Sequence, residues 1–219
     1  GQGDSGDTDV IFLTGVNQKH SGVELETNYM VNDMLDLMFV ASFGNWKFDG
    51  DANGNYQETE YNSEGQAIGY TTTEYAYALD GLYVGDMPQT SYVLGVTLKP
   101  IKDLRIQAIH KMYDKNYSDW SPSAREFDGT NDDADRAQVW EAPSYNRLDL
   151  HMSYKLPKVK DLDMMLTANI FNVLDEVYVQ DAVDNSQYNG YGSKQHLPHN
   201  AEVFLGTPRY ANIGLSIGF

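Results

Sequence analysis

The end of the chain alternates strictly between apolar and polar side chains. From Ala211 to Phe219 every second residue is apolar, and the residues between them are Asn212, Gly214, Ser216 and Gly218. A period of two places the two sets on opposite faces of a β-strand. A soluble β-sandwich could contain such a strand. The low bulk of the polar set and the aromatic Phe219 on the apolar side instead favour a membrane barrel strand that ends at an aromatic girdle.

Six earlier stretches share this period and are predicted to be strands. Their ranges are 21–31, 35–48, 91–98, 104–113, 145–156 and 162–174. The clearest is 145–156, in which Leu148, Leu150 and Met152 share one face. A short apolar run at 10–13 and the stretch 70–79 indicate further extended structure.

The connections between the predicted strands alternate in length. Short turns fall at 31–34, 99–103 and 157–161; the first, second and third long segments cover 49–88, 114–143 and 175–206. Structureless loops longer than about 12–15 residues are uncommon in compact domains, whereas outer-membrane barrels combine short periplasmic turns with long extracellular loops. The pattern therefore predicts an all-β fold, part of an antiparallel transmembrane β-barrel with long extracellular loops.

Seven strands are not expected to close such a barrel. Bacterial single-chain barrels have an even number of strands, and an open edge in lipid leaves backbone groups unsatisfied at a cost of several kcal/mol each. Residues 1–9 are polar and contain no signal peptide. We therefore expect residues 1–219 to be the C-terminal part of a barrel whose other strands lie in the same protein or in another chain.

Composition excludes several classes of function. The formal net charge of -17 argues against nucleic acid as a partner. The chain has no cysteine, so disulfides, thiolate metal sites and cysteine nucleophiles are excluded. None of the sequence patterns of serine hydrolases, zinc proteases, P-loop or Rossmann proteins is present, and no enzymatic activity is predicted. The sixteen tyrosines and nineteen glycines suit β-structure with many turns and aromatic rims.

Three segments resemble the C-terminal region of TonB-dependent outer-membrane receptors. Residues 169–172 (NIFN), followed by Asp175-Glu176 and Tyr178, resemble the signature of the penultimate strand of that family. Residues 206–210 (GTPRY) before the final alternation resemble its last strand, and 22–24 (GVE) resemble a strand further upstream. The three segments occur in the family's order and span nearly the whole chain.

This resemblance implies a role and partners that the residues alone do not give. It implies the last seven strands of a 22-stranded barrel in the bacterial outer membrane, with the plug domain and the earlier strands absent from this chain. It also implies uptake of a scarce nutrient, powered by the TonB complex acting on the plug. The acidic, tyrosine-rich loops resemble those of Bacteroidetes-type receptors, some of which work with a surface lipoprotein lid. Phe219 would serve as the assembly signal, and its deletion is expected to lower surface assembly.

Aromatic residues of the long segments are the candidates for ligand binding, because Tyr and Trp offer stacking platforms for sugars or aromatic chelators. The candidates are Tyr117, Trp120, Trp140, Tyr188 and Tyr191. The alternative is that these rings form the barrel rim or pack loop against loop.

Two further clusters suggest metal chemistry. Asp128, Asp132, Asp133 and Asp135 offer oxygen ligands for calcium, although the distal Glu of an EF-hand is missing and a solvated acidic loop is the alternative. His196 and His199 could bind haem or a metal. No other cofactor is predicted.

Two other classes of protein fit parts of the pattern. A passive porin or adhesin barrel would share the strands and turns but would have no plug. A secreted β-sandwich that binds carbohydrate would share the alternation but would bury Leu148, Ile213 and Leu215 inside the protein.

Overall fold

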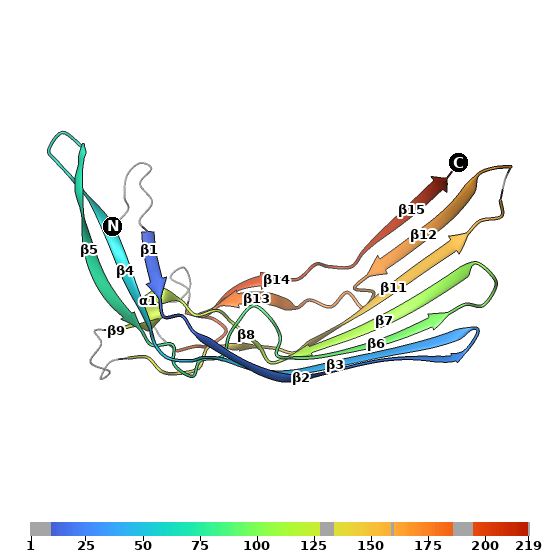
Figure 1. Cartoon of the computed structure of the whole chain (residues 1–219), viewed down its shortest axis with the longest axis horizontal. Helices are drawn as coiled ribbons and strands as arrows, with labels where there is room; N and C mark the ends of the chain where they lie inside the picture. The colour runs from blue at the N-terminus through green and yellow to red at the C-terminus, as the bar shows by residue number, and fades with distance from the viewer. Residues whose placement is uncertain (1–9, 128–133, 159, 186–194, 219) are drawn as a thin grey trace.

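A seven-stranded antiparallel sheet forms the main part of the molecule. The computed structural model describes residues 10–127, 134–158, 160–185 and 195–218. The strands of this sheet are β2 (Gln18–Asn32), β3 (Leu35–Phe48), β6 (Thr90–Leu98), β7 (Leu104–Asp114), β11 (Tyr145–Lys155), β12 (Asp163–Phe171) and β15 (Tyr210–Gly218). They lie side by side in the order of the chain, from β2 at one edge to β15 at the other (Figure 1). Each strand predicted from the alternation is present, with ends displaced by at most three residues.

The strand register places the apolar residues of each strand opposite those of the next strand. One row runs through all seven strands, consisting of Tyr29, Leu37, Val96, Ala108, Leu150, Ile170 and Ala211. We call the side of the sheet that carries this row the apolar face, and the opposite side the polar face. Because side chains alternate along a strand, a register slip of one residue would exchange the two faces.

The apolar face is left uncovered by the described residues. Ile213 is 80% exposed, Leu215 56% and Val23 68%. A β-sandwich would bury this face against a second sheet. Ile213 and Leu215, which that alternative would bury, are exposed, and Leu148 is half-buried.

Short turns close one end of the sheet and hydrogen bond to one another. In the β2–β3 turn the backbone N–H of Met34 donates to Asn32 Oδ1 at 2.9 Å, the local bond by which Asn favours turns. The N–H of Lys99 donates to the Met34 carbonyl at 2.8 Å, and the N–H of Lys155 donates to the Asp103 carbonyl at 2.9 Å. These bonds join neighbouring turns and align the ends of the strands along one edge of the sheet.

The long segments contain more structure than the sequence predicted. β4 (Ala52–Tyr61) and β9 (Glu126–Phe127) were not predicted. They form a second sheet with β1 (Val10–Thr14) and β5 (Ala67–Tyr77), which correspond to the stretches 10–13 and 70–79 expected to be extended. Strands β8 (Asn116–Tyr117) and β10 (Glu141–Ala142) form a pair, as do β13 (Val179–Val183) and β14 (Glu202–Leu205). The single short helix of the described chain is α1 (Pro122–Arg125). The β4–β5 hairpin projects away from the main sheet (Figure 1).

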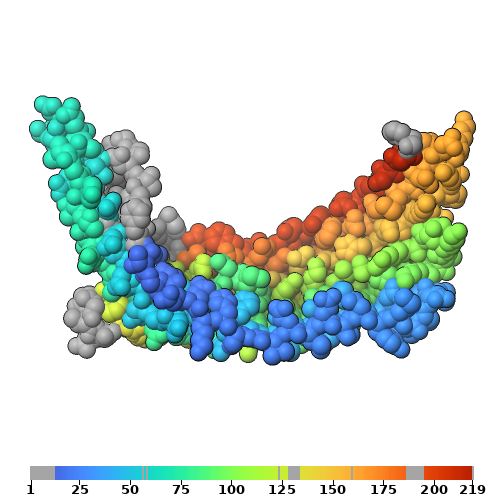
Figure 2. Space-filling model, viewed as in Figure 1, coloured from blue at the N-terminus to red at the C-terminus, as the bar shows by residue number. Residues whose placement is uncertain are grey.

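The buried apolar core lies among the long segments and not in the main sheet. Phe48, Ala52, Tyr77, Leu79, Leu82, Tyr117 and Val139 form it, and Trp120 packs against its side. Most of these residues belong to the first and second long segments, which therefore fold against each other. Together the main sheet and the long segments form a trough that is hollowed on one side (Figure 2).

No helix among the described residues has the length and apolar character needed to cross a membrane.

Candidate functional site

A ladder of polar side chains crosses the polar face of the main sheet. The register aligns Asp36, Thr97, Gln107, His151, Asn169 and Asn212 on six successive strands. Gln107 Nε2 donates to Thr97 Oγ1 at 3.1 Å, and Asn169 Nδ2 donates to Asn212 Oδ1 at 2.7 Å. His151 Nδ1 and Asn169 Oδ1 lie 2.8 Å apart. Hydrogen bonds between neighbouring strands pair several polar groups of this face, which suits a wall that borders water or another polar surface.

Asp149, on the same face of β11 as His151, is bonded to the end of β12. Its carboxylate is buried and accepts hydrogen bonds from Lys111 Nζ at 3.0 Å and from the backbone N–H of Asn172 at 2.9 Å. Arg147 lies 3.7 Å away on the same strand. Two cations and a backbone donor compensate this buried charge, and buried charges are stable only with such partners.

Asn172, at the end of the 169–172 segment, connects two parts of the backbone through hydrogen bonds. Asn172 is fully buried with a positive φ of 49°, a conformation that Asn tolerates better than most residues. Its Nδ2 donates to the carbonyls of Glu176 and Thr207 at 2.9 and 3.2 Å, and its Oδ1 accepts from the Glu176 N–H at 3.1 Å. Asn172 therefore ties the start of the third long segment to the entry of the last strand.

Three tyrosine rings pack against one another at the end of the polar face nearest the long segments. The ring centroids of Tyr113 and Tyr145 lie 4.9 Å apart, and those of Tyr145 and Tyr178 lie 4.3 Å apart. Arg147 donates to the Tyr178 hydroxyl at 3.1 Å. Tyr178 is buried directly over Gly206, where an added Cβ would meet the ring at 1.9 Å. The glycine of the 206–210 segment is thus required by the ring that passes over it.

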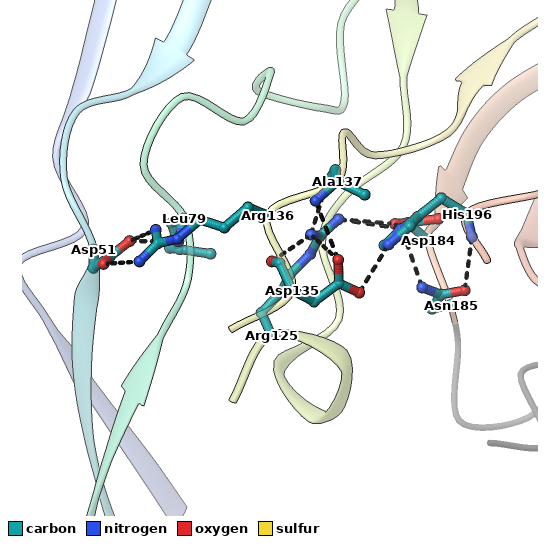
Figure 3. A network of polar contacts seen from close by, with 9 residues as sticks. All are labelled: Asp51, Leu79, Arg125, Asp135, Arg136, Ala137, Asp184, Asn185 and His196. Carbon is teal, nitrogen blue, oxygen red and sulfur yellow. Dashed lines mark hydrogen bonds and ion pairs between the residues drawn. The ribbon is translucent and has the colours of Figure 1, made fainter. Parts of the chain in front are cut away.

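A buried ionic cluster joins the second and third long segments (Figure 3). Arg125, at the end of α1, has a side chain that is 0% exposed, and its Nη2 lies 3.3 Å from Asp184 Oδ2, which is 1% exposed. Arg125 Nη1 donates to the carbonyls of Asp135 and Ala137 at 2.9 and 2.7 Å. Burial lowers the pKa of Arg125, while the two carboxylates of Asp135 and Asp184 oppose that shift. We call Arg125, Asp135, Asp184 and His196 the loop junction.

His196 completes the loop junction from the third long segment. Its Nδ1 lies 2.5 Å from Asp184 Oδ2, and its Nε2 lies 2.9 Å from Asp135 Oδ2. The hydrogen bond with Asp184 raises the pKa of His196, and burial opposes that rise. The sequence suggested haem or metal capture for this histidine, but the structure engages both of its ring nitrogens with carboxylates.

An ion pair of Asp51 and Arg136 adds the first long segment to this assembly (Figure 3). The Arg136 guanidinium donates to both oxygens of Asp51, at 2.5 and 2.8 Å. Asp51 also accepts from the backbone N–H groups of Leu79 and Asp80 at 3.0 and 3.1 Å. The hydrogen bond from Arg136 holds the pKa of Asp51 below its usual value. All three long segments are therefore linked through 135–136.

Next to the loop junction, three carboxylates from the three long segments lie close together. They belong to Asp86, Asp119 and Asp181. Burial, followed by the charge of Asp86, raises the pKa of Asp119 to about 6. The backbone holds this arrangement, because the Asp119 N–H donates to the Ala182 carbonyl and the Asp184 N–H donates to the Asp119 carbonyl, both at 2.7 Å. Burial therefore favours the protonated forms of Asp119 and Asp181 relative to ordinary aspartates.

The structure places three of the five predicted ligand-binding aromatics among packed residues. Tyr117 is buried and stacks on Tyr83 at 4.1 Å between ring centroids. Trp120 packs edge to face on Phe48, and Trp140 is partly buried in the second long segment. Tyr188 and Tyr191 lie outside the described residues. Ligand binding by these five residues stays a prediction.

The predicted calcium loop lies mostly outside the described residues, which include Asp135 but not Asp128, Asp132 or Asp133. Asp135 is engaged by Arg125 and His196. Within the described part of the chain, no group of three or more His, Asp or Glu side chains is arranged to hold a metal ion. Phe219 also lies outside it, so calcium binding and the assembly signal both stay predictions.

The whole net charge of the chain resides in the long segments. These segments hold 21 of the 32 acidic residues and 4 of the 15 basic residues. The remaining residues, which include the main sheet, its turns and the N-terminal stretch, are balanced. Acidic long segments at one end of a neutral wall give the molecule a strong electrostatic asymmetry.

An all-β wall with one uncovered apolar face, one hydrogen-bonded polar face and acidic loops at one end defines a portion of a transmembrane β-barrel. The sequence profile of the family described as TonB dependent receptor-like, beta-barrel matches residues 2–173. The chain belongs to this family of outer-membrane transport receptors, as its resemblance to them predicted.

Two other comparisons add little to this assignment. A similar solved structure is the closed form of the ferric-catecholate import receptor Fiu from E. coli K12, with 18% identity and a TM-score of 0.37. The match covers 92% of this chain and 28% of that receptor, so the chain spans less than a third of its length. No curated protein matches the chain.

Proposed function

We propose that this chain supplies the C-terminal strands and substrate-facing loops of a receptor for TonB-dependent active uptake of a scarce nutrient. The observation that carries the proposal is the pair of faces on the main sheet. The apolar row crosses all seven strands, while hydrogen bonds link polar side chains of neighbouring strands on the other side. A wall of this kind separates lipid from a polar lumen.

The wall requires neighbours at both of its edges. β2 and β15 each have one strand partner within the described residues, so each has one edge with no strand partner there. In the hydrocarbon layer such edges must be paired. We infer that strands outside this chain pair with β2 and β15, in the same protein or in another chain, and that a plug fills the closed barrel.

Further partners follow from the same proposal. The apolar face would contact outer-membrane lipid, and the TonB complex would act through the plug. A surface lipoprotein could cover the acidic loops as a lid, which affinity purification of the complete receptor from detergent extracts would test. Recovery of the receptor without any lipoprotein would reject the lid alone and leave uptake unaffected.

Uptake measurements test the proposed function. A strain lacking the gene for the complete receptor would be compared with its parent in accumulating labelled ferric chelates, cobalamin and oligosaccharides. We expect one class of nutrient to be lost in the deletion strain and also in a strain without TonB. Uptake that persists without TonB would favour the passive porin. Recovery of the protein in the soluble fraction would reject both barrel functions.

A further inference from the structure

The loop junction contains one group that can change its charge near neutral pH. His196 has a side chain that is 8% exposed, and the charged groups facing its ring within the described residues are Asp184, Asp135 and Arg125. Asn185 is its remaining polar neighbour. These groups come from α1, from residues 134–136 and from the end of β13, so the ring lies where the second and third long segments meet.

The geometry around the ring favours a proton on each nitrogen. A carboxylate oxygen accepts hydrogen bonds and donates none when ionised. Nδ1 and Nε2 each face such an oxygen, at 2.5 and 2.9 Å. Nδ1 also lies 3.2 Å from Arg125 Nη2 and 3.1 Å from Asn185 Nδ2, but the carboxylate is much closer and decides the protonation of that nitrogen. A neutral imidazole could serve only one of the two carboxylates.

The charge balance of the loop junction also favours a doubly protonated His196. With His196 protonated, two cations face two carboxylates and the buried cluster is neutral. Loss of the proton leaves Arg125 alone between Asp135 and Asp184, with a net negative charge in a buried site. An uncompensated buried charge is strongly destabilising, so opening of the loop junction becomes easier when His196 is neutral.

We propose that His196 is a pH-sensitive latch that holds the second and third long segments together when protonated and releases them when neutral. Because the pKa of His196 is raised above its usual value by Asp184, the stabilisation is complete below about pH 6.5, the ordinary histidine value, and is lost as pH rises through the raised pKa. If the proposed uptake function holds, the latch would control how far these segments open over the lumen.

Hydrogen exchange on the complete receptor in lipid nanodiscs tests the latch without requiring transport. Exchange would be followed by mass spectrometry from pH 7 to 9, corrected for the intrinsic effect of pH. The reporting amides are those of Asp119, Asp184 and His196, which bond across or within the loop junction. We expect their opening to increase by up to about tenfold per pH unit, the limit for one proton. Amides of β11 and β12 serve as the reference for an assembled barrel.

Two substitutions and a control separate the latch from a purely structural role. His196→Gln should give increased opening at pH 7 and no further pH response, whereas His199→Gln, on an exposed neighbour, should keep the wild-type profile. Asp184→Asn removes one carboxylate from the ring and should move the transition to lower pH, which provides a test if His196→Gln fails to assemble. A wild-type profile without pH response, a His196→Gln profile like wild type, or an unmoved transition in Asp184→Asn would each overturn the proposal.

Discussion

Single residues determine how the long segments meet the barrel wall. Asn172 and Tyr178 follow β12 closely in sequence and Gly206 lies much further along, yet the three form one packed unit at the point where β12 ends and β15 begins. Their residue types follow from local requirements: an amide that bonds three backbone groups, a ring that stacks on Tyr145, and a glycine beneath that ring. The resemblance of these segments to a family signature therefore has a structural explanation.

Gly206→Ala is expected to disturb this unit. The new methyl group would overlap the Tyr178 ring and separate it from Tyr145, and overpacking of this kind costs roughly 1–3 kcal/mol. Thermal unfolding of the complete receptor in detergent should show a lower midpoint. Gly69→Ala is the matched control, since nothing lies within 4 Å of the added carbon there. Equal midpoints for the two variants would contradict this assignment.

Asp119 gives a second prediction at the residue scale. Its pKa of about 6 lies above the ordinary value of 3.8, so its stabilising effect is complete below pH 3.8 and is lost as pH rises through about 6. Asp119→Asn should remove this loss and make the opening of residues 118–121 nearly independent of pH between 4 and 6.5. Exchange measurements in that range would check it. A variant that keeps the wild-type slope would show that Asp119 is not the titrating group.

At the scale of elements, the strands of the main sheet could be predicted from the sequence because alternation is local. The predicted range 145–156 is found as β11 (Tyr145–Lys155), and 35–48 is found as β3 without change. β4 was missed because its polar sequence, ANGNYQETEY, has no apolar period. The loop junction was missed because Arg125 and Asp184 are 59 positions apart and nothing local links them.

A positive charge should destabilise the receptor on the apolar face of β15 and should be tolerated on its polar face. Leu215→Arg places a cation on the apolar face, at an expected cost of roughly 2–4 kcal/mol near the bilayer midplane. Ser216→Arg, one residue further, places it on the polar face and should be tolerated. The yield of assembled receptor on heat-modifiable electrophoresis would compare them. Similar yields for both variants would contradict a lipid-facing Leu215.

On the scale of the whole molecule, the separation of charge governs encounters with solutes. The long segments carry the entire net charge of -17, while the rest of the chain is balanced. Such a field attracts cations and repels anions over about one Debye length, roughly 10 Å at 0.1 M salt. Arg125 and Arg136, which are already counted in this net charge, form ionic links that hold the repelling segments together.

This asymmetry predicts selective, salt-dependent binding of cationic probes. A fluorescent pentalysine peptide should bind the complete receptor in nanodiscs more tightly than a pentaglutamate peptide, and binding should weaken markedly between about 0.02 and 0.5 M salt. Replacing Glu60, Glu64 and Glu74 of the first long segment by Gln should reduce it. Lys102→Gln at the short turns is the control and should leave it unchanged. Equal binding of both peptides would contradict a dominant loop field.

The order of strands in the wall has a consequence for biogenesis. Each neighbour in the main sheet is also the next main-sheet strand along the chain, so the contacts that build it form between consecutive hairpins and threading is not required. Sheets with such sequential pairing lose little chain entropy at each step and can grow one hairpin at a time. Where the earlier strands belong to the same protein, β2 pairs in the same sequential way with the strand before it, and the outer edge of β15 is the last to find a partner. Formation of that closing seam is then expected to be the slowest step in insertion of the barrel.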